Sequence, residues 1–189
     1  SDLASGAARR YPELIGALRR HYVDERRLHL RIAPAIPASD IDESVIQAAG
    51  FRLAGASGWV SAVVDLSAAT EVIRRGLGQK WRNGLNKAER LGLLVEEVSA
   101  TAKFSGFLDE YRAFLSRRDF ETTVTPDLLK DLQPSLGPEH GMRAWRCSRE
   151  GQLLAGVLIA RYGGRAEYLV GILTDTARPY AAGQLVLWR

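Results

Sequence analysis

Apolar residues recur at helical spacing along much of the chain. Between Tyr11 and Tyr22, the residues Leu14, Ile15 and Leu18 fall on one face, which predicts an amphipathic helix. The pattern is stronger in the middle of the sequence, where aromatic and leucine side chains repeat every three or four residues. The other predicted helices run over residues 39–48, where Ser39 and Asp42 form a capping-box variant, and over residues 68–77, 79–91, 102–118 and 126–132.

Capping signals mark the ends of several of these helices. Thr125 followed by Pro126 is typical of an N-cap with proline at the first helical position. Ser67 predicts the N-cap of the helix that follows it, and Gly92 is expected to end the helix before it. These signals predict helix ends independently of the apolar faces.

Alternating and β-rich stretches predict the strands. Leu28 to Ile36 alternates in polarity, and residues 51–66 are expected to form a hairpin that turns between Gly55 and Gly58. Turn signals at 150–151 and 163–164 separate three β-rich runs that should pair as an antiparallel meander. The other predicted strands cover residues 93–98, 143–149, 153–162 and 165–173. This order of elements predicts an α+β fold.

Positive charge is concentrated in one segment. The chain has a net charge of +4, while the segment between Arg74 and Arg90 holds six cationic side chains and one acidic side chain, Glu89. Such a segment favours a phosphate-bearing partner: a nucleotide sugar, a pyrophosphate lipid, tRNA or an anionic membrane surface. A solvated helix face is an equally good interpretation of the same charges.

Other features limit the location and the chemistry. The longest apolar run, 153–160, is too short to span a bilayer, and residues 1–10 lack the apolar stretch of a signal peptide. Cys147 has no second cysteine to pair with, which fits a reducing cytoplasm. The three histidines are scattered without metal-ligand spacing, and no nucleophile motif is present. We therefore expect a cytoplasmic protein without a metal site, and the sequence assigns no catalytic residue.

The segment 79–92 carries a family resemblance. It reads Gln-Lys-Trp-Arg-Asn-Gly-Leu-Asn-Lys-Ala-Glu-Arg-Leu-Gly and resembles the Fem signature K-x-R-x-x-[IL]-x-x-A-x-[KR]-x-G. The resemblance to Fem-type (FemAB-like) peptidoglycan aminoacyltransferases spans about residues 60–189. It implies a GNAT-like mixed sheet flanked by helices. The positions that fill the signature are Lys80, Arg82, Leu85, Ala88, Arg90 and Gly92.

The resemblance also implies a division into domains. Residues 1–58 are expected to be the remnant of a first GNAT-like domain, and residues 59–189 a second one. Residues 184–189 look like the first turns of a helix that the sequence does not finish. We therefore expect the second domain to be incomplete at its C-terminal end, nearly inactive as it stands, and prone to self-association.

Helix geometry places the cationic residues of the signature. On a helix over 79–91, Trp81, Leu85 and Ala88 share an apolar face that should lie on the sheet. Lys80 and Lys87 then lie side by side on one flank, able to bind a diphosphate as point charges, and Arg82 lies on the other flank. The alternative is that these charges only solvate the helix and complement its dipole.

The resemblance adds two substrate-binding candidates. Arg118 closes the helix at 102–118, in a region where similar enzymes place an arginine near the diphosphate of the acceptor. Helix-dipole complementarity is the competing interpretation. Tyr168 opens the stretch Tyr168…Gly171…Asp175, which is similar to the family and is assigned to substrate binding.

The donor loop departs from the GNAT pattern. Acyl-CoA enzymes of that class hold a pyrophosphate with a [QR]-x-x-G-x-[GA] loop between a strand and a helix. The matching stretch, residues 178–183, makes Arg178 and Gly183 the cofactor-binding candidates, and Ala181 replaces the first glycine. Fem-type enzymes take their acyl group from aminoacyl-tRNA, so this departure favours the tRNA-dependent interpretation. No tightly bound cofactor is expected, and aminoacyl-tRNA or acyl-CoA serves as the donor substrate.

Three functions remain open from the sequence. The first is transfer of an amino acid from aminoacyl-tRNA to the peptide of a peptidoglycan precursor, which needs positioning more than a strong nucleophile. The second is an acyl-CoA-dependent GNAT-type N-acyltransferase that acts on a polysaccharide or a small amine. The third is a non-catalytic domain that binds an anionic ligand. The expected partners are a nucleotide- or lipid-linked peptidoglycan precursor, tRNA, the inner membrane surface and a second copy of the chain.

Overall fold

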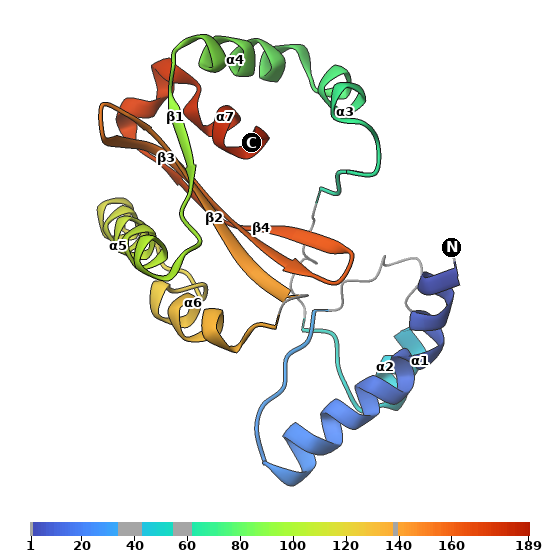
Figure 1. Ribbon diagram of the computed structural model, residues 1–189. Helices are drawn as coiled ribbons and strands as arrows, with labels where there is room; N and C mark the ends of the chain where they lie inside the picture. The colour runs from blue at the N-terminus through green and yellow to red at the C-terminus, as the bar shows by residue number, and fades with distance from the viewer. Residues whose placement is uncertain (1, 34–42, 55–61, 138–139) are drawn as a thin grey trace. The chain divides into compact units, whose positions relative to one another are not determined.

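The structure is a computed structural model that describes residues 2–33, 43–54, 62–137 and 140–189 (Figure 1). The chain divides into two compact units, Ser1–Asp65 and Leu66–Arg189. The domain boundary that we expected at residue 58 lies outside the described residues. None of the helices described is both long enough and apolar enough to cross a bilayer.

The first unit is helical in the residues described. Helix α1, Asp2–Arg19, continues into a π-helical turn, Arg20–Glu25, and helix α2 covers Glu43–Ala48. Ile15 on the predicted apolar face is buried, and Nη1 of Arg19 donates to the carbonyl of Ala49 at 3.0 Å. The guanidinium occupies the space where a Cβ on residue 50 would lie, so this link requires Gly50. Helix α1 is longer than predicted, and the Arg19 hydrogen bond ties its C-terminal end to the end of α2.

Two strand predictions in this unit are wrong in the residues described. Residues 28–33 form no strand, and neither do residues 51–54 or 62–66. The remaining predicted positions, 34–36 and 55–61, lie outside the described residues. Leu53 and Val63 are 86% and 92% exposed, so this alternation has no packed face beneath it. A strand needs a hydrogen-bonded neighbour, which an alternating pattern cannot supply by itself.

The second unit is built on a four-stranded sheet of order β1-β2-β3-β4. The predicted strands are confirmed as β1 (Leu94–Glu97), β2 (His140–Arg149), β3 (Gln152–Tyr162) and β4 (Arg165–Leu173). The α+β class is therefore confirmed. All pairings among the described strands are antiparallel, so the mixed pairing that we expected is absent from this sheet. Two-residue turns join β2 to β3 and β3 to β4, and such turns allow only antiparallel neighbours.

Helices cover both faces of this sheet (Figure 1). Helices α5 (Thr101–Arg118) and α6 (Pro126–Leu132) lie on one face, and α4 (Gln79–Arg90) and α7 (Ala182–Trp188) lie on the other. Helix α3 (Thr70–Gly76) precedes α4. The helix expected to begin at Gln184 thus begins two residues earlier, after a 3-10 segment over Asp175–Tyr180.

The two faces hold separate cores. Alternation along β3 sends Leu158 into the core under α5 and Val157 into the core under α4 and α7. The first core is rich in large side chains, among them Phe104, Phe107 and Tyr111. The buried residues of the second are Leu85, Ala88, Cys147, Leu154, Ala155, Val157, Ala177, Ala182, Leu185 and Val186.

The capping predictions have different outcomes. Oγ1 of Thr125 accepts a hydrogen bond from the Leu128 amide at 3.2 Å, which confirms that N-cap. Gly92 has a φ of 62° directly after α4, as expected of a C-terminal glycine. Ser67 is not the N-cap of α3, because that helix begins at Thr70 with Ala69 in the cap position.

Candidate functional site

Helix α4 packs on the sheet through its predicted apolar face. Leu85 and Ala88 are fully buried. Trp81 is half-buried, and its ring meets that of Trp188 edge to face, with 6.5 Å between the ring centroids. This packing fixes the rotation of the helix, so the direction of its charged residues is also fixed.

Lys80 and Lys87 point away from this packed face. Both side chains are exposed, and neither has a hydrogen bond or ion pair with another described residue. Seven residues separate them, which is close to two helical turns, so they lie on the same flank of α4. We call this pair the α4 cationic edge. Its two charges are available to an anionic ligand.

The Arg82 side chain is held by hydrogen bonds, although helix geometry places it on an open flank of α4. Its guanidinium donates to the carbonyl of Arg75 and, at 2.8 Å, to the carbonyl of Leu77. These carbonyls lie at the C-terminal end of α3, where the helix dipole favours a positive charge. Arg82 therefore links α3 to α4 and is separate from the cationic edge.

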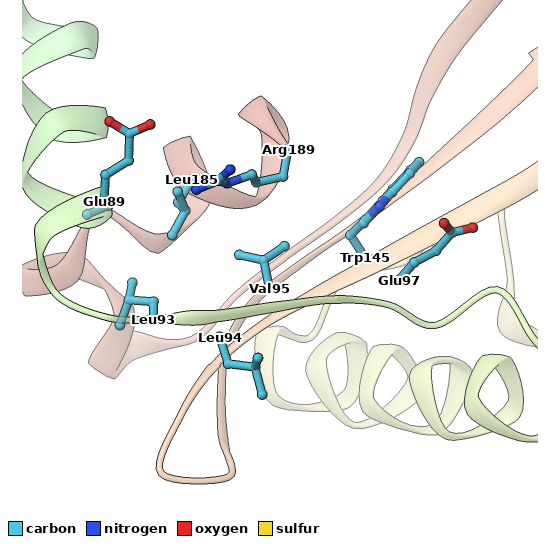
Figure 2. Close-up of a pocket in the computed structure, with 9 residues that line it drawn as sticks. Glu89, Leu93, Leu94, Val95, Glu97, Trp145, Leu185 and Arg189 are labelled. Carbon is cyan, nitrogen blue, oxygen red and sulfur yellow. The ribbon is translucent and has the colours of Figure 1, made fainter.

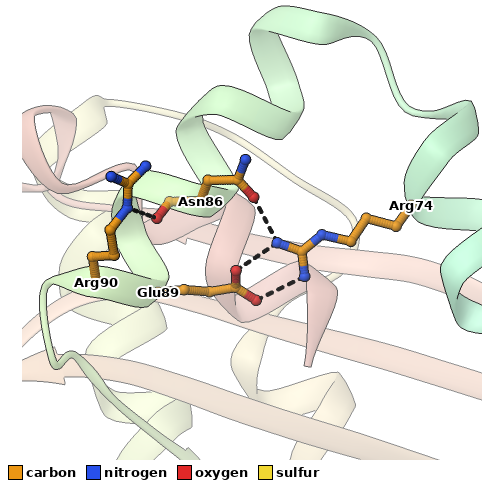
Figure 3. A network of polar contacts seen from close by, with 4 residues as sticks. All are labelled: Arg74, Asn86, Glu89 and Arg90. Carbon is orange, nitrogen blue, oxygen red and sulfur yellow. Dashed lines mark hydrogen bonds and ion pairs between the residues drawn. The ribbon is translucent and has the colours of Figure 1, made fainter.

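Arg74 forms a second link between the two helices (Figure 3). Its guanidinium donates to both carboxylate oxygens of Glu89, at 3.0 Å and 2.5 Å, and to Oδ1 of Asn86 at 2.6 Å. The hydrogen bonds lower the pKa of Glu89 and raise that of Arg74. The guanidinium also lies over the ring of Trp188, 5.6 Å from its centroid. Arg74 thus ties α3 to both α4 and α7.

Hydrogen bonds within the fold hold several of the cationic side chains of the segment 74–90 in place. Nε of Arg90 donates to the carbonyl of Asn86 at 3.0 Å, within its own helix. Of the six cations between 74 and 90, three therefore have partners inside the fold. Only the Arg74–Glu89 contact is an ion pair, so the segment keeps its excess of positive charge, and Arg75, Lys80 and Lys87 are exposed.

The predicted donor loop lies between β4 and α7. Arg178 is exposed near the end of the 3-10 segment. Ala181, which stands where the GNAT pattern has its first glycine, has a φ of 52° in the left-handed region. A Cβ on Gly183 would lie 3.4 Å from Cδ1 of Leu173, so this residue packs closely on β4. The loop keeps a backbone conformation that favours glycine, although the sequence supplies alanine.

Arg118 reaches the same loop from the other face of the sheet. One of its Nη atoms lies 2.9 Å from Oδ1 of Asp175, and its guanidinium lies over the ring of Phe114. Arg149, which the sequence did not single out, lies over the ring of Tyr180 at 5.1 Å from its centroid. The antiparallel register brings the ends of β2 and β4 to one end of the sheet. No local signal marks Arg149, because its partner lies 31 residues further along the chain.

Tyr168 lies on β4 beside an irregularity in the strand pairing. Val170 pairs with Leu158 and Tyr168 pairs with Ile159, so one β4 residue between them has no opposite partner. The Tyr168 hydroxyl fills the space where a Cβ on Gly171 would lie. Burial raises the pKa of this hydroxyl. Tyr168 as a whole is 56% exposed, so its ring lies at the surface of the edge strand, with its hydroxyl over Gly171.

The remaining predicted chemistry is consistent with a site that lacks a nucleophile. Burial raises the pKa of the Cys147 thiol to about 11, so it is protonated at neutral pH, as expected of a buried strand cysteine. Within the described residues, no group of histidine, cysteine and carboxylate side chains is arranged to hold a metal ion.

Figure 2 shows one pocket of the domain, which none of the predicted site residues lines. It has a volume of about 420 Å³ and lies between α4, α7, β1 and Trp145 of β2. A smaller pocket of about 220 Å³ lies under α5. Neither of these two pockets is lined by Lys80, Lys87, Arg118, Tyr168 or Arg178.

Comparison with known proteins gives one result. The model of the acetyltransferase (GNAT) domain family matches residues 75–189, which is more than half of the chain. The match begins within α3 and extends through the sheet to α7. No curated protein matches the chain.

Proposed function

The chain belongs to the GNAT acetyltransferase domain family and is thus an acyltransferase domain, and we propose that it is of the Fem type. In this proposal it transfers an amino acid from aminoacyl-tRNA to the peptide of a peptidoglycan precursor in the cytoplasm. The observation that carries the proposal is the α4 cationic edge. A packed helix holds two unpaired lysines on one flank, within the segment that has the Fem signature.

The proposed reaction needs little from the side chains beyond positioning. The precursor amine attacks the ester carbonyl of the aminoacyl-tRNA, forming a C–N bond. The ester C–O bond breaks, the amine loses a proton, and the ribose oxygen gains one. Fixed groups that orient the reactants and stabilise the oxyanion lower such a barrier without a covalent intermediate. Such a reaction does not need a thiolate nucleophile, and the Cys147 thiol is protonated at neutral pH.

Lys80 and Lys87 have the proposed role of binding the acceptor. The precursor carries a diphosphate, in its nucleotide-linked or its lipid-linked form, and two directed ammonium groups suit its charge. The lipid-linked form would bring the edge to the inner membrane surface, where anionic lipids favour the same lysines. Arg118 and Tyr168 are proposed to contact the acceptor, and Arg82 supports α4 through its bonds to α3.

The test of this proposal is binding followed by transfer. A UDP-linked muramyl pentapeptide is titrated by calorimetry into the wild-type chain and into Lys80→Ala/Lys87→Ala, at low and at high salt. We expect the double variant to lose about tenfold in affinity, and the difference to shrink in salt, because exposed charges are screened. Lys130→Ala, an exposed lysine on α6, is the matched control. Equal affinity in the double variant and the wild type would refute the role of the edge.

The acyl donor is tested separately. Transfer from charged tRNA and from acetyl-CoA is measured with the same acceptor. The proposal predicts product from charged tRNA, and product from acetyl-CoA alone would replace it with the second candidate below.

The second candidate is an acyl-CoA-dependent N-acyltransferase acting on a polysaccharide or small amine. It is favoured by the loop that follows β4, where Arg178 is exposed and Arg118 contacts Asp175. The exposed guanidinium of Arg178, in the segment before α7, suits the pyrophosphate of coenzyme A. Under this candidate, Arg178→Ala weakens acetyl-CoA binding. Arg165→Ala, at the first residue of β4, leaves it unchanged.

A further inference from the structure

The pocket between α4 and α7 has a mixed chemical character. Its apolar lining comes from six residues: Ala88, Leu93, Leu94, Val95, Trp145 and Leu185. Three charged residues, Glu89, Glu97 and Arg189, complete the lining of the pocket (Figure 2). The volume of about 420 Å³ is within the range of small-molecule sites, so it accommodates a ligand with one ring and a short chain.

One of the lining charges, that of Glu89, is paired within the fold. Glu89 accepts two hydrogen bonds from Arg74, which neutralise its carboxylate. Arg189 lies near Glu89, and its positive charge also contributes to the lowered pKa of that carboxyl. Arg74 therefore neutralises Glu89, whereas the Arg189 guanidinium has no hydrogen bond or ion pair with another described residue and keeps its positive charge.

Glu97 provides the unpaired negative charge of the pocket lining. Its carboxylate is exposed and has no hydrogen bond or ion pair with another described residue. It is paired with Trp145 across β1 and β2, so the two side chains lie on the same face of the sheet. An indole and a carboxylate thus lie side by side at the pocket, on two strands that fix their separation.

An indole beside an unpaired carboxylate is suited to a cationic ligand. The aromatic ring attracts an ammonium through its quadrupole, and the carboxylate adds a charged hydrogen bond. We infer that this pocket binds an organic ammonium, with its cationic group between Glu97 and Trp145 and its apolar body against Val95 and Leu185. The inference holds whichever acyl donor the domain uses.

The neighbouring residue provides a matched control. Glu96 lies on the opposite face of the sheet, lines the smaller pocket, and pairs with Lys103 at 3.4 Å. Glu96→Gln therefore removes the same charge from the same strand without changing the larger pocket. A long-range effect of charge would appear in both variants, whereas direct binding would appear only in Glu97→Gln.

The experiment is a calorimetric titration of the 189-residue chain with phenethylammonium. The neutral isostere 2-phenylethanol and the anion 3-phenylpropanoate are titrated in parallel. We expect saturable binding of the cation, an affinity about tenfold lower in Glu97→Gln, and no change in Glu96→Gln. Trp145→Phe keeps an aromatic ring and should retain binding, whereas Trp145→Leu should lose it. Circular dichroism of each variant establishes that it is folded.

Several results would overturn the inference. Binding of the alcohol or of the anion as tight as that of the cation would show that the pocket does not select positive charge. Equal losses in Glu97→Gln and Glu96→Gln would show that the carboxylate acts at a distance. The absence of saturable cation binding to the folded wild-type chain would rule out the site itself. None of these results depends on the acyl donor or on Lys80 and Lys87, so the proposed Fem-type function stands or falls separately.

Discussion

The two faces of the sheet are packed in different ways. Under α5, large aromatic side chains fill the space so closely that a Cβ on Gly156 would lie 2.8 Å from Cε2 of Phe107. Under α4 and α7, the core contains four buried alanines, and a pocket of about 420 Å³ remains. Polar links from Arg74 and Arg82 hold the helices on that side. One face thus provides a close-packed core, and the other combines packing with space for a ligand.

The largest expected effect tests the close-packed face. Phe107→Ala should lower the free energy of unfolding by about 3–5 kcal/mol, because a buried aromatic leaves both a transfer loss and a cavity. Denaturant unfolding of the variant gives this value. Leu187→Ala on α7, where the side chain is 49% exposed, is the control and should cost less than about 1 kcal/mol. Similar costs for the two variants would contradict the contrast between the faces.

The next effect concerns backbone strain on the more open face. Ala181→Gly should raise the free energy of unfolding by about 1 kcal/mol, because the left-handed φ of 52° disfavours a Cβ. Thermal unfolding measures the shift. Ala177→Gly, at a buried position in the same segment, is the control and should destabilise. Destabilisation by both substitutions would show that the loop is not strained at Ala181.

The smallest effect tests the polar link between α3 and α4. The folded-state pKa of Glu89 is lowered, so its contribution to stability is present above its ordinary pKa and is lost as the pH falls through the lowered value. We expect wild type to have a higher Tm than Glu89→Gln at neutral pH, and the difference to vanish in acid. Asp127→Asn removes an exposed carboxylate that is paired with Arg112, and should change the Tm less. A difference that persists in acid would mean that the charge of Glu89 is not responsible.

Local sequence patterns were sufficient to predict an element wherever its formation depends on its own residues. The apolar face of α4, the cap at Thr125 and the turns of the meander were all predicted, because each depends on residues a few positions apart. The alternation in the first unit failed for the complementary reason: residues 28–33 have no described strand beside them. A repeating pattern indicates what a segment is able to form, and a neighbour decides whether it forms.

The residues of the candidate site also differ in whether local spacing or tertiary packing determines their position. Helical spacing was enough to place Lys80 and Lys87 on one flank of α4, whereas the role of Arg82 at the end of α3 depends on how two helices pack. Arg118 and Asp175 are 57 residues apart, and only the antiparallel sheet brings them together. Such contacts depend on non-local packing, which no short window of sequence contains.

By itself, the sequence determined that α4 is an amphipathic helix, that three strands form a meander, and that the chain resembles an acyltransferase family, which the family match supports at the level of the GNAT domain. The tertiary structure decided which face each strand residue occupies. Alternation puts Trp145 on one side of β2 and Arg146 on the other, but it does not indicate which helices cover each side. Only the packing of α4 and α7 over Trp145 and its neighbour Glu97 gives that side the pocket of about 420 Å³, whereas Arg146 lines the pocket of about 220 Å³ on the other side.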